Sequence, residues 1–283
     1  MSASFSCTSP CKLNEFLYIT GRRPDGYHSL QTLFVVLNAG DRLDFETSDN
    51  GEITLECSLD IPPEQNLIMK AARLMHAYVK KSCGCRIRAA KRLPAGGGVG
   101  GGSGNAATAL LVLNRLWKLR LPEEELLALA AGLGADVPIF IKGKTCFAQG
   151  TGTELLEIEY PQRWYVVCNP GCKAPTAELF ADPHLKRDSK KRSLRELLSA
   201  PFENAFTPVV SRRFPEVREL ISRLSEFGKA RMSGSGSSCF VSFEKEEQAR
   251  ACERALLSEG RSAFAAQSCL KNPIIAALDA AGL

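Results

Sequence analysis

Hydrophobic and polar positions alternate in short segments through the first sixty residues of the chain. The alternation runs through residues 13–19, 30–35, 43–45 and 53–55, where apolar side chains recur at about every second position. A period of two is typical of β-strands that have one buried face. We therefore expect this part of the chain to fold mainly as strands.

From Asn66 the apolar residues recur every three to four positions, which is the period of an amphipathic helix. Beyond this helix, strand and helix patterns are mixed in both halves of the chain. We expect further strands at 85–90, 145–148, 154–159, 164–168, 239–243 and 262–267. We expect further helices at 106–117, 122–131, 194–198, 202–224 and 245–257. The pattern predicts an α+β protein in two lobes, with the first domain at 1–155 and the second at 156–283.

A glycine-rich loop joins the strand expected at 85–90 to the next helix. It covers residues 94–104, and six of the seven residues from 96 to 102 are glycine. Backbone without side chains approaches a phosphate closely, and a following helix, here with Ser103 or Asn105 expected at its start, adds unpaired amides. The loop lacks the Gly-Lys-Ser/Thr ending of a Walker loop, and its crowded Gly-x-Gly-x-x-Gly matches are weak evidence. We interpret it as a phosphate-binding loop; the alternative is a flexible linker.

A second small-residue loop, Ser-Gly-Ser-Gly-Ser-Ser at 233–238, precedes the strand expected at 239–243. It is a candidate to face phosphate as well. A surface turn is the alternative interpretation.

Three side chains are candidates for chemistry. Asp136 stands before the apolar run 137–141, where a carboxylate would lose much of its water and act as a general base; a helix-terminal turn residue is the alternative. Lys12 shares a strand face with Asn14 and is a candidate to stabilise a transferring phosphoryl group, although an isolated strand lysine is usually plain surface. His28 follows the turn Asp-Gly-Tyr and is either functional or structural.

Composition narrows the class of protein. With 283 residues, 45% hydrophobic and 24% charged, the chain has the composition of a folded globular protein. The net charge of +5 is scattered, and even the densest basic run, 186–195, is interrupted by acidic and polar residues, so we expect no nucleic-acid partner. The chain contains no run of eighteen apolar residues, so we expect no membrane span.

Eleven cysteines are many for a chain of this length. Their odd number and the absence of an apolar leader favour buried thiols in a reducing compartment, the cytoplasm, over a disulfide framework. Neither the pair Cys7 and Cys11 nor the pair Cys83 and Cys85 has the spacing of a structural zinc site.

Together these motifs resemble the GHMP small-molecule kinases. The stretches that carry the resemblance keep the order of the family and span most of the chain: Lys-Leu-Asn at 12–14, Thr-Gly-Arg-Arg-Pro-Asp-Gly-Tyr-His at 20–28 followed by Gln-Thr at 31–32, the loop 94–108, Gly-Ala-Asp-Val-Pro at 134–138, and Ser-Gly-Ser-Gly at 233–236. The glycine loop and the last motif are shared widely in the superfamily, whereas the motif at 20–28 is more specific.

The resemblance implies an N-terminal ATP-binding lobe of the ribosomal S5 domain 2-like type and a C-terminal α+β lobe, with the acceptor bound between them. Asp136 would take or orient the proton of the attacking hydroxyl, and Lys12 would hold both that carboxylate and the developing charge. Asn66 would contact adenine, and Ser103 would lie near Mg²⁺ and phosphate. The remaining ATP contacts would come from the loop residues Pro94, Ala95, Gly96, Gly97, Gly98, Val99, Gly100, Gly101, Gly102 and Gly104.

The resemblance also implies the acceptor, a cytidylylated methylerythritol phosphorylated on its 2-hydroxyl in the non-mevalonate route to isoprenoids. Tyr27 and Phe180 would sandwich its cytosine ring, and His28 would read the polar edge. Thr176 and Asn14 would contact the methylerythritol and phosphate region. The resemblance leaves the oligomeric state open.

Two positions depart from the family pattern. Glu15 stands where we expect an apolar residue, and a buried carboxylate there needs a partner. Gly104 stands where we expect a hydroxyl residue, which removes one possible phosphate or capping contact. Two alternatives remain: a kinase of mevalonate, homoserine or a sugar, which has no use for a cytosine sandwich, and a noncatalytic nucleotide sensor or RNA-binding protein, against which the retained Lys12 and Asp136 argue.

Overall fold

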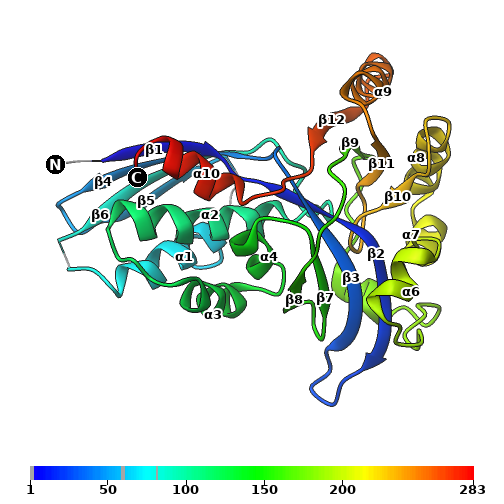
Figure 1. Cartoon of the computed structure of the whole chain (residues 1–283), viewed down its shortest axis with the longest axis horizontal. Helices are drawn as coiled ribbons and strands as arrows, with labels where there is room; N and C mark the ends of the chain where they lie inside the picture. The colour runs from blue at the N-terminus through cyan, green and yellow to red at the C-terminus, as the bar shows by residue number, and fades with distance from the viewer. Residues whose placement is uncertain (1–2, 59–60, 81) are drawn as a thin grey trace.

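The computed structural model describes residues 3–58, 61–80 and 82–283, and within them the chain forms two lobes on either side of a long hairpin. Figure 1 shows β2 and β3 as this hairpin, with the N-terminal sheet and helices on one side and β9 to β12 with their helices on the other. The described residues contain three four-stranded sheets, one in each lobe and one built on the hairpin. The expected α+β class with two lobes is confirmed.

The first lobe packs one sheet against helices. Its strands lie in the order β1 (Ser4–Thr8), β4 (Arg42–Ser48), β6 (Gly84–Ala90), β5 (Ile53–Cys57), and only the β5–β6 pair is parallel. Its helices are α1 (Leu67–His76), α2 (Gly101–Leu116), α3 (Glu123–Leu133) and α4 (Val137–Lys142). Apolar faces of these elements form one buried core, in which α2 is enclosed on most sides.

The hairpin and the second lobe each contain one of the other two four-stranded sheets. The hairpin sheet has the order β2 (Cys11–Arg22), β3 (His28–Leu37), β7 (Cys146–Gln149), β8 (Glu154–Glu157). The second-lobe sheet has the order β10 (Arg231–Met232), β11 (Cys239–Phe243), β9 (Trp164–Asn169), β12 (Ser262–Gln267). The second-lobe helices are α5 (Thr176–Ala181), α6 (Leu194–Ser199), α7 (Thr207–Arg213), α8 (Pro215–Ser225) and α9 (Glu246–Ser258).

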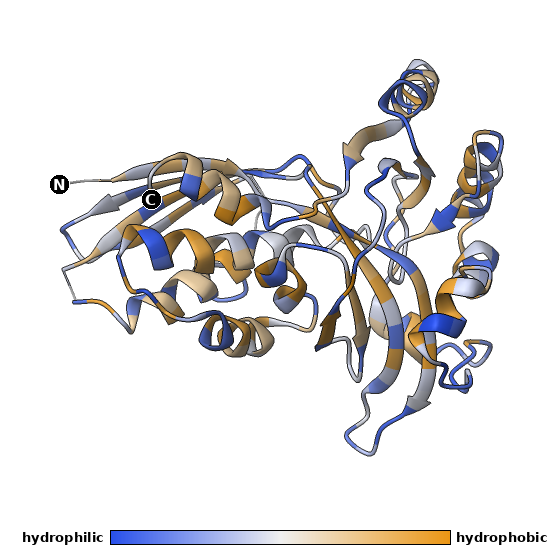
Figure 2. Ribbon diagram, viewed as in Figure 1, coloured by the Kyte–Doolittle hydropathy of each residue, from blue (hydrophilic) through white to orange (hydrophobic). Residues whose placement is uncertain are grey.

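Hydrophobic contacts join the hairpin to both lobes. Leu13 and Val35 of the hairpin pack with Tyr165 and Phe240 of the second lobe in one buried cluster, while Phe34 belongs to the core of the first lobe. Figure 2 shows hydrophobic stretches alternating with polar ones along β2 and β3 where they pass between the lobes. The hairpin therefore packs against both lobes and fixes their positions relative to each other.

The structure corrects the expected elements in three respects. The helix expected at 202–224 is two helices, because Phe214 is extended (φ −128°) and Pro215 starts α8. The sequence patterns missed α4, α5 and α10 (Pro273–Ala280), which have six, six and eight residues and show no clear period, although α6, also of six residues, was predicted. The two-residue strand β10 was missed for the same reason.

The last helix returns to the beginning of the chain. Ile274 and Leu278 of α10 belong to the core of the first lobe, and Figure 1 shows α10 beside β1. The division of the chain between residues 155 and 156 stays a prediction. Within the described residues, no helix is long and apolar enough to cross a membrane.

Candidate active site

A cavity of 760 Å³ brings together residues of the hairpin, the glycine loop and both lobes. It is lined by most of the predicted site residues: Lys12, Asn14, Tyr27, His28, Asp136, Thr176, Phe180 and loop residues 94–103. Two predicted residues, Asn66 and Gly104, do not line it. Lining residues that sequence reasoning did not single out include Phe34 and Lys91.

Lys12 lines this cavity, and its side chain is only 3% exposed. Its ammonium group is 3.2 Å from the Asp136 carboxylate, and it donates to the Asn14 side chain at 2.7 Å and to the Gly98 carbonyl at 3.2 Å. It also lies 5.3 Å from the centre of the Phe34 ring. Lys12 is thus a buried cation that joins the strand, the glycine loop and the carboxylate, and the surface interpretation of it is wrong.

Asp136 is the N-cap residue of α4, and its side chain makes no capping hydrogen bond. The carboxylate is therefore free to face the cavity. Its side chain is 40% exposed, so the expectation that it would lose much of its water is wrong. The apolar run after it forms the buried body of α4, while the carboxylate itself stays outside this apolar environment.

The glycine loop passes directly into helix α2. Gly100 has a left-handed conformation (φ 71°) and is the N-cap of α2, which begins at Gly101. Ser103 and Asn105 therefore lie inside the helix, and the expectation that one of them caps it is wrong. Ser103 still lines the cavity from the first turn.

The second small-residue loop, residues 233–238, is hydrogen-bonded to the glycine loop. The Ser233 hydroxyl donates to the Gly98 carbonyl at 2.9 Å and accepts from the backbone amide of Asn14 at 3.2 Å. A Cβ at Gly98 would lie 2.2 Å from the Ser233 carbonyl oxygen, so only glycine permits this approach. Gly234 and Ser235 of the same loop line the cavity.

The base of the glycine loop is held by Asp41, which sequence reasoning missed. Its carboxylate is fully buried and accepts from the backbone amides of Arg92 (2.7 Å) and Leu93 (3.0 Å), from the Asn105 side chain (2.9 Å) and from Lys91. Burial by itself raises the pKa of Asp41, but Lys91 and the two amides outweigh it and hold the pKa below its usual value. The signal in the sequence was an acidic residue directly before a predicted strand, which is too common to select it.

A cluster of Tyr27, His28 and Phe180, called here the aromatic cluster, lines another part of the cavity. The rings of His28 and Phe180 stack with centroids 4.7 Å apart and planes inclined by 15°. Tyr27 is 67% exposed beside them. Nε2 of His28 is buried without a hydrogen-bond partner, and burial, Arg187 and Arg22 lower the pKa of this imidazole, so it is neutral near pH 7. A neutral ring with an unsatisfied nitrogen suits recognition of a polar ligand edge.

The remaining predicted residues have structural partners. The Asn66 side chain accepts from the Ile68 amide at 2.9 Å and caps α1. Thr176 pairs with the Ser235 hydroxyl at 2.7 Å. A Cβ at Gly104 would lie 2.3 Å from the Pro10 carbonyl oxygen, which explains why glycine suits this position in this chain.

Glu15 has one hydrogen-bond donor and one cation as partners, although Arg231 forms an ion pair rather than a hydrogen bond with Oε2. It is 1% exposed and accepts from the Tyr165 hydroxyl at 2.6 Å, and Arg231 lies 2.8 Å from its other oxygen. The sheet register shifts between Asn14 and Leu17, where Glu15 stands. This pair connects the strand of Lys12 to the strand that leads into the loop 233–238.

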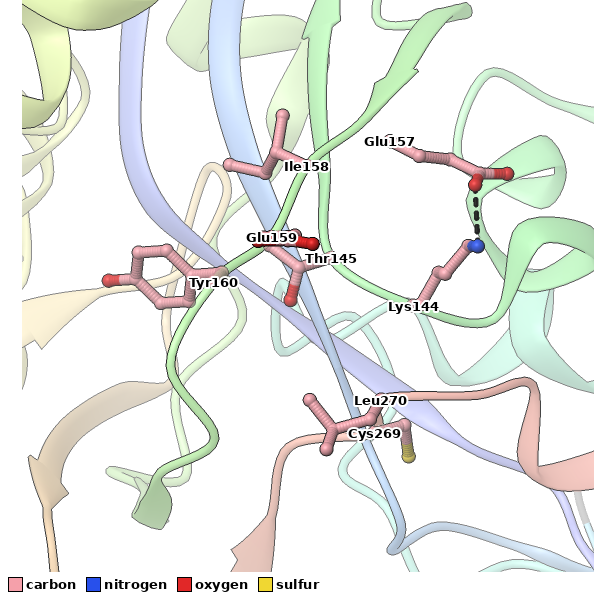
Figure 3. A pocket seen from close by; sticks show the side chains of 8 residues that line it. All are labelled: Lys144, Thr145, Glu157, Ile158, Glu159, Tyr160, Cys269 and Leu270. Atoms are coloured by element: carbon pink, nitrogen blue, oxygen red, sulfur yellow. Dashed lines mark ion pairs between the residues drawn. The ribbon is translucent and has the colours of Figure 1, made fainter.

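A separate cavity of 370 Å³ contains none of the predicted site residues. Figure 3 shows Glu157 paired with Lys144 on its wall, and the pair is 2.5 Å apart. Among the described residues, no group of three His, Cys, Asp or Glu side chains is arranged to hold a metal ion, and all eleven cysteines are unpaired thiols, most of them buried.

Comparisons with known proteins identify the family of this chain. Residues 66–144 match the family model of the GHMP kinases N terminal domain, and residues 185–262 match that of the GHMP kinases C terminal domain. A crystal structure of mevalonate kinase superposes with a TM-score of 0.66 over 93% of this chain and 99% of that chain, and at 14% identity this likeness concerns the fold alone. The fold is that of a GHMP kinase.

More similar relatives narrow the family. A 4-diphosphocytidyl-2-C-methyl-D-erythritol kinase of Burkholderia multivorans is 44% identical over 282 residues, covering 96% of each chain, and one of Tolumonas auensis is 46% identical over 243 residues, covering 86% of this chain and 85% of that one. A crystal structure of 4-(cytidine 5'-diphospho)-2C-methyl-D-erythritol kinase superposes with a TM-score of 0.81 at 34% identity, over 93% of this chain and 99% of that chain. This chain belongs to the family of 4-diphosphocytidyl-2-C-methyl-D-erythritol kinases.

Proposed function

We propose that this protein transfers the terminal phosphoryl group of ATP to the 2-hydroxyl of 4-diphosphocytidyl-2-C-methyl-D-erythritol, in the non-mevalonate route to isoprenoid precursors. The observation that carries the proposal is the Lys12–Asp136 pair, 3.2 Å apart in a cavity that also holds the glycine loop and the aromatic cluster. Phosphoryl transfer depends mainly on positioning and electrostatics, so a cation and a carboxylate at such a place are sufficient chemistry.

Each member of the pair has a distinct role. The exposed carboxylate of Asp136 accepts or orients the proton of the acceptor hydroxyl as the new P–O bond forms. Lys12 orients this carboxylate, and its positive charge stabilises the charge that develops on the transferred group. Because Lys12 is fixed by Asn14 and Gly98, the charge is in place before the reaction begins.

The glycine loop is proposed to bind the triphosphate through residues 94–104 and the first turn of α2. Mg²⁺ prefers hard oxygen ligands and usually retains waters and phosphate oxygens. The Ser103 hydroxyl, which lines the cavity, fits a magnesium ion carried mainly by the nucleotide. When bound, this ion would neutralise phosphate charge. Asn66 stays a predicted adenine contact, with its side-chain oxygen already engaged in capping α1.

The aromatic cluster is proposed to bind the cytosine ring. Tyr27 and Phe180 offer stacking surfaces, and the unpartnered Nε2 of His28 offers a polar contact to the base edge. Thr176 and Asn14 line the same cavity and are the proposed contacts of the methylerythritol and phosphate region. Smaller acceptors such as mevalonate or homoserine have no ring for this cluster, which favours the cytidylylated acceptor.

The test is phosphate transfer by the purified protein from magnesium ATP, with the cytidylylated methylerythritol offered beside mevalonate, homoserine and galactose. We expect product mass for the first acceptor alone. Transfer to another acceptor would overturn the cytosine site but keep the roles of Lys12 and Asp136. Binding of ATP without transfer would indicate a noncatalytic protein.

We expect the protein to work in the cytoplasm, since its cysteines are free thiols.

A further inference from the structure

The basic run 186–195 is the charged segment of the sequence that the proposed reaction does not use. Lys186, Lys190, Lys191 and Arg195 are exposed, whereas Arg187 and Arg192 are half-buried. The Ser189 amide donates to the Ile19 carbonyl at 2.9 Å, and the backbone of Arg192 exchanges hydrogen bonds with the Gln31 side chain at 2.7 and 3.0 Å. The run is therefore docked along the hairpin next to the aromatic cluster, and Arg187 turns toward α5.

The guanidinium of Arg187 binds three backbone carbonyls around the C-terminal end of α5. It donates to Phe180 from Nε (3.2 Å) and Nη2 (2.6 Å), to Asp182 from Nη2 (2.6 Å) and to Leu185 from Nη1 (3.0 Å). The last carbonyls of a helix have no partner within the helix, and in a helix of six residues they are a large share of the total. Arg187 thus supplies much of what holds the end of α5 in place.

Helix α5 carries two residues of the proposed acceptor site, Thr176 and Phe180. The Phe180 ring packs edge-on against Phe206, with centroids 4.9 Å apart, and face-on against His28. The carbonyl of Phe180 is bound by the Arg187 guanidinium. The position of the stacking ring therefore depends on the Arg187 fork.

Arg187 also places positive charge near His28. The two residues line one smaller cavity together with Arg22 of β2 and Phe180. The nearby carboxylates are engaged elsewhere: Asp25 pairs with Arg23, and Asp182 pairs with arginines of α7. After burial, Arg187 and then Arg22 are the causes that lower the pKa of His28.

We propose that Arg187 is a positioning residue for the base of the acceptor, a role that rests on the proposed function. Its fork holds Phe180 for stacking, and its charge keeps the neighbouring His28 ring neutral, so that a ring nitrogen accepts a hydrogen bond from the amino group of cytosine. Arg187 touches neither the reacting phosphate nor the attacking hydroxyl. It acts on how tightly the base is held.

Two substitutions separate the fork from the charge. Arg187→Met removes both, while Arg187→Lys keeps a positive charge but cannot bind three carbonyls with a planar fork. Lys186→Met is the matched control, because it removes an exposed charge from the adjacent position. For each variant we would measure KM for the cytidylylated acceptor, KM for ATP, kcat and the melting temperature, from pH 5 to pH 8.

Near neutral pH we expect both Arg187 variants to raise KM for the acceptor about tenfold, which corresponds to about 1.4 kcal/mol of lost binding. The values of kcat and KM for ATP should stay near those of the wild type. In Arg187→Met the pKa of His28 rises, so KM should begin to increase at a higher pH on acidification than in the wild type or Arg187→Lys. Lys186→Met should match the wild type throughout.

An unchanged KM for the acceptor in both variants would overturn the inference. A rise in KM for ATP and an equal fall in kcat, together with a lower melting temperature, would also overturn the inference. That pattern is expected of an arginine that only stabilises the fold. If Arg187→Met does not fold, Arg187→Lys still tests the fork. Failure of the wild type to phosphorylate the cytidylylated acceptor would instead refute the proposed function, which the first measurement establishes separately.

Discussion

The ammonium group of Lys12 lies 3.2 Å from the carboxylate of Asp136, although one belongs to a strand near the beginning of the chain and the other to the start of helix α4. The exposures of the two side chains differ sharply, at 3% and 40%. The buried cation is fixed by protein groups, and the exposed carboxylate remains accessible to an acceptor hydroxyl. This asymmetry suits a pair in which one member stabilises charge and the other handles a proton.

Asp136→Ala should lower kcat by at least about two orders of magnitude, because proton transfer by a positioned group is worth roughly 10²–10⁴. Affinity for ATP should stay nearly intact, since the triphosphate is held by the glycine loop. Equilibrium binding of ATP and steady-state turnover check both parts. Asp188→Ala, at an exposed position, is the control. Loss of ATP binding in Asp136→Ala would show that the residue is structural.

Tyr27→Ala should raise KM for the cytidylylated acceptor by about tenfold while kcat changes little, as expected for loss of one stacking partner. Tyr27 is 67% exposed, so the melting temperature should not change. Tyr78→Ala, another exposed tyrosine outside the cavity, is the matched control. An unchanged KM would contradict the cytosine platform.

Arg231→Met should destabilise the fold by about 3–5 kcal/mol, because it leaves the buried Glu15 carboxylate without its cation. The double variant Glu15→Leu with Arg231→Met removes both charges and should recover most of that loss. Urea unfolding of the wild type, both single variants and the double variant gives the coupling free energy. A double variant no more stable than Arg231→Met would refute this account of the pair.

Asp41→Asn should lower stability at neutral pH, and the difference from the wild type should shrink on acidification. The folded-state pKa of Asp41 is lower than its unfolded value, so its contribution is present above the unfolded pKa and is lost as the pH falls through the folded pKa. Melting temperatures from pH 2 to pH 7 measure this, with Asp188→Asn as the control. A difference independent of pH would mean that the Asp41 charge contributes nothing.

The sequence by itself predicted the elements that have strong periods or distinctive turns. The strands of the first sixty residues, helix α1 after Asn66, the strand before the glycine loop and the α+β class all follow from local patterns. It failed at Phe214 and Pro215, where a long apolar period concealed a break, and at the short helices α4, α5 and α10. These three helices have six to eight residues and depend on tertiary contacts, so their own sequences contain too little signal.

The proposed chemistry of the site was also predicted from the sequence. Glycine density, a lysine beside an asparagine on one strand face, and an aspartate before an apolar run indicate phosphate binding and phosphoryl transfer without any coordinates. Only the tertiary structure decided that Lys12 is buried, that Asp136 stays exposed, that Asp41 holds the loop and that Arg187 lies behind Phe180. Burial and long-range hydrogen bonds depend on which distant segments pack together, and that depends on the contacts of the whole chain, which no local pattern of residues contains.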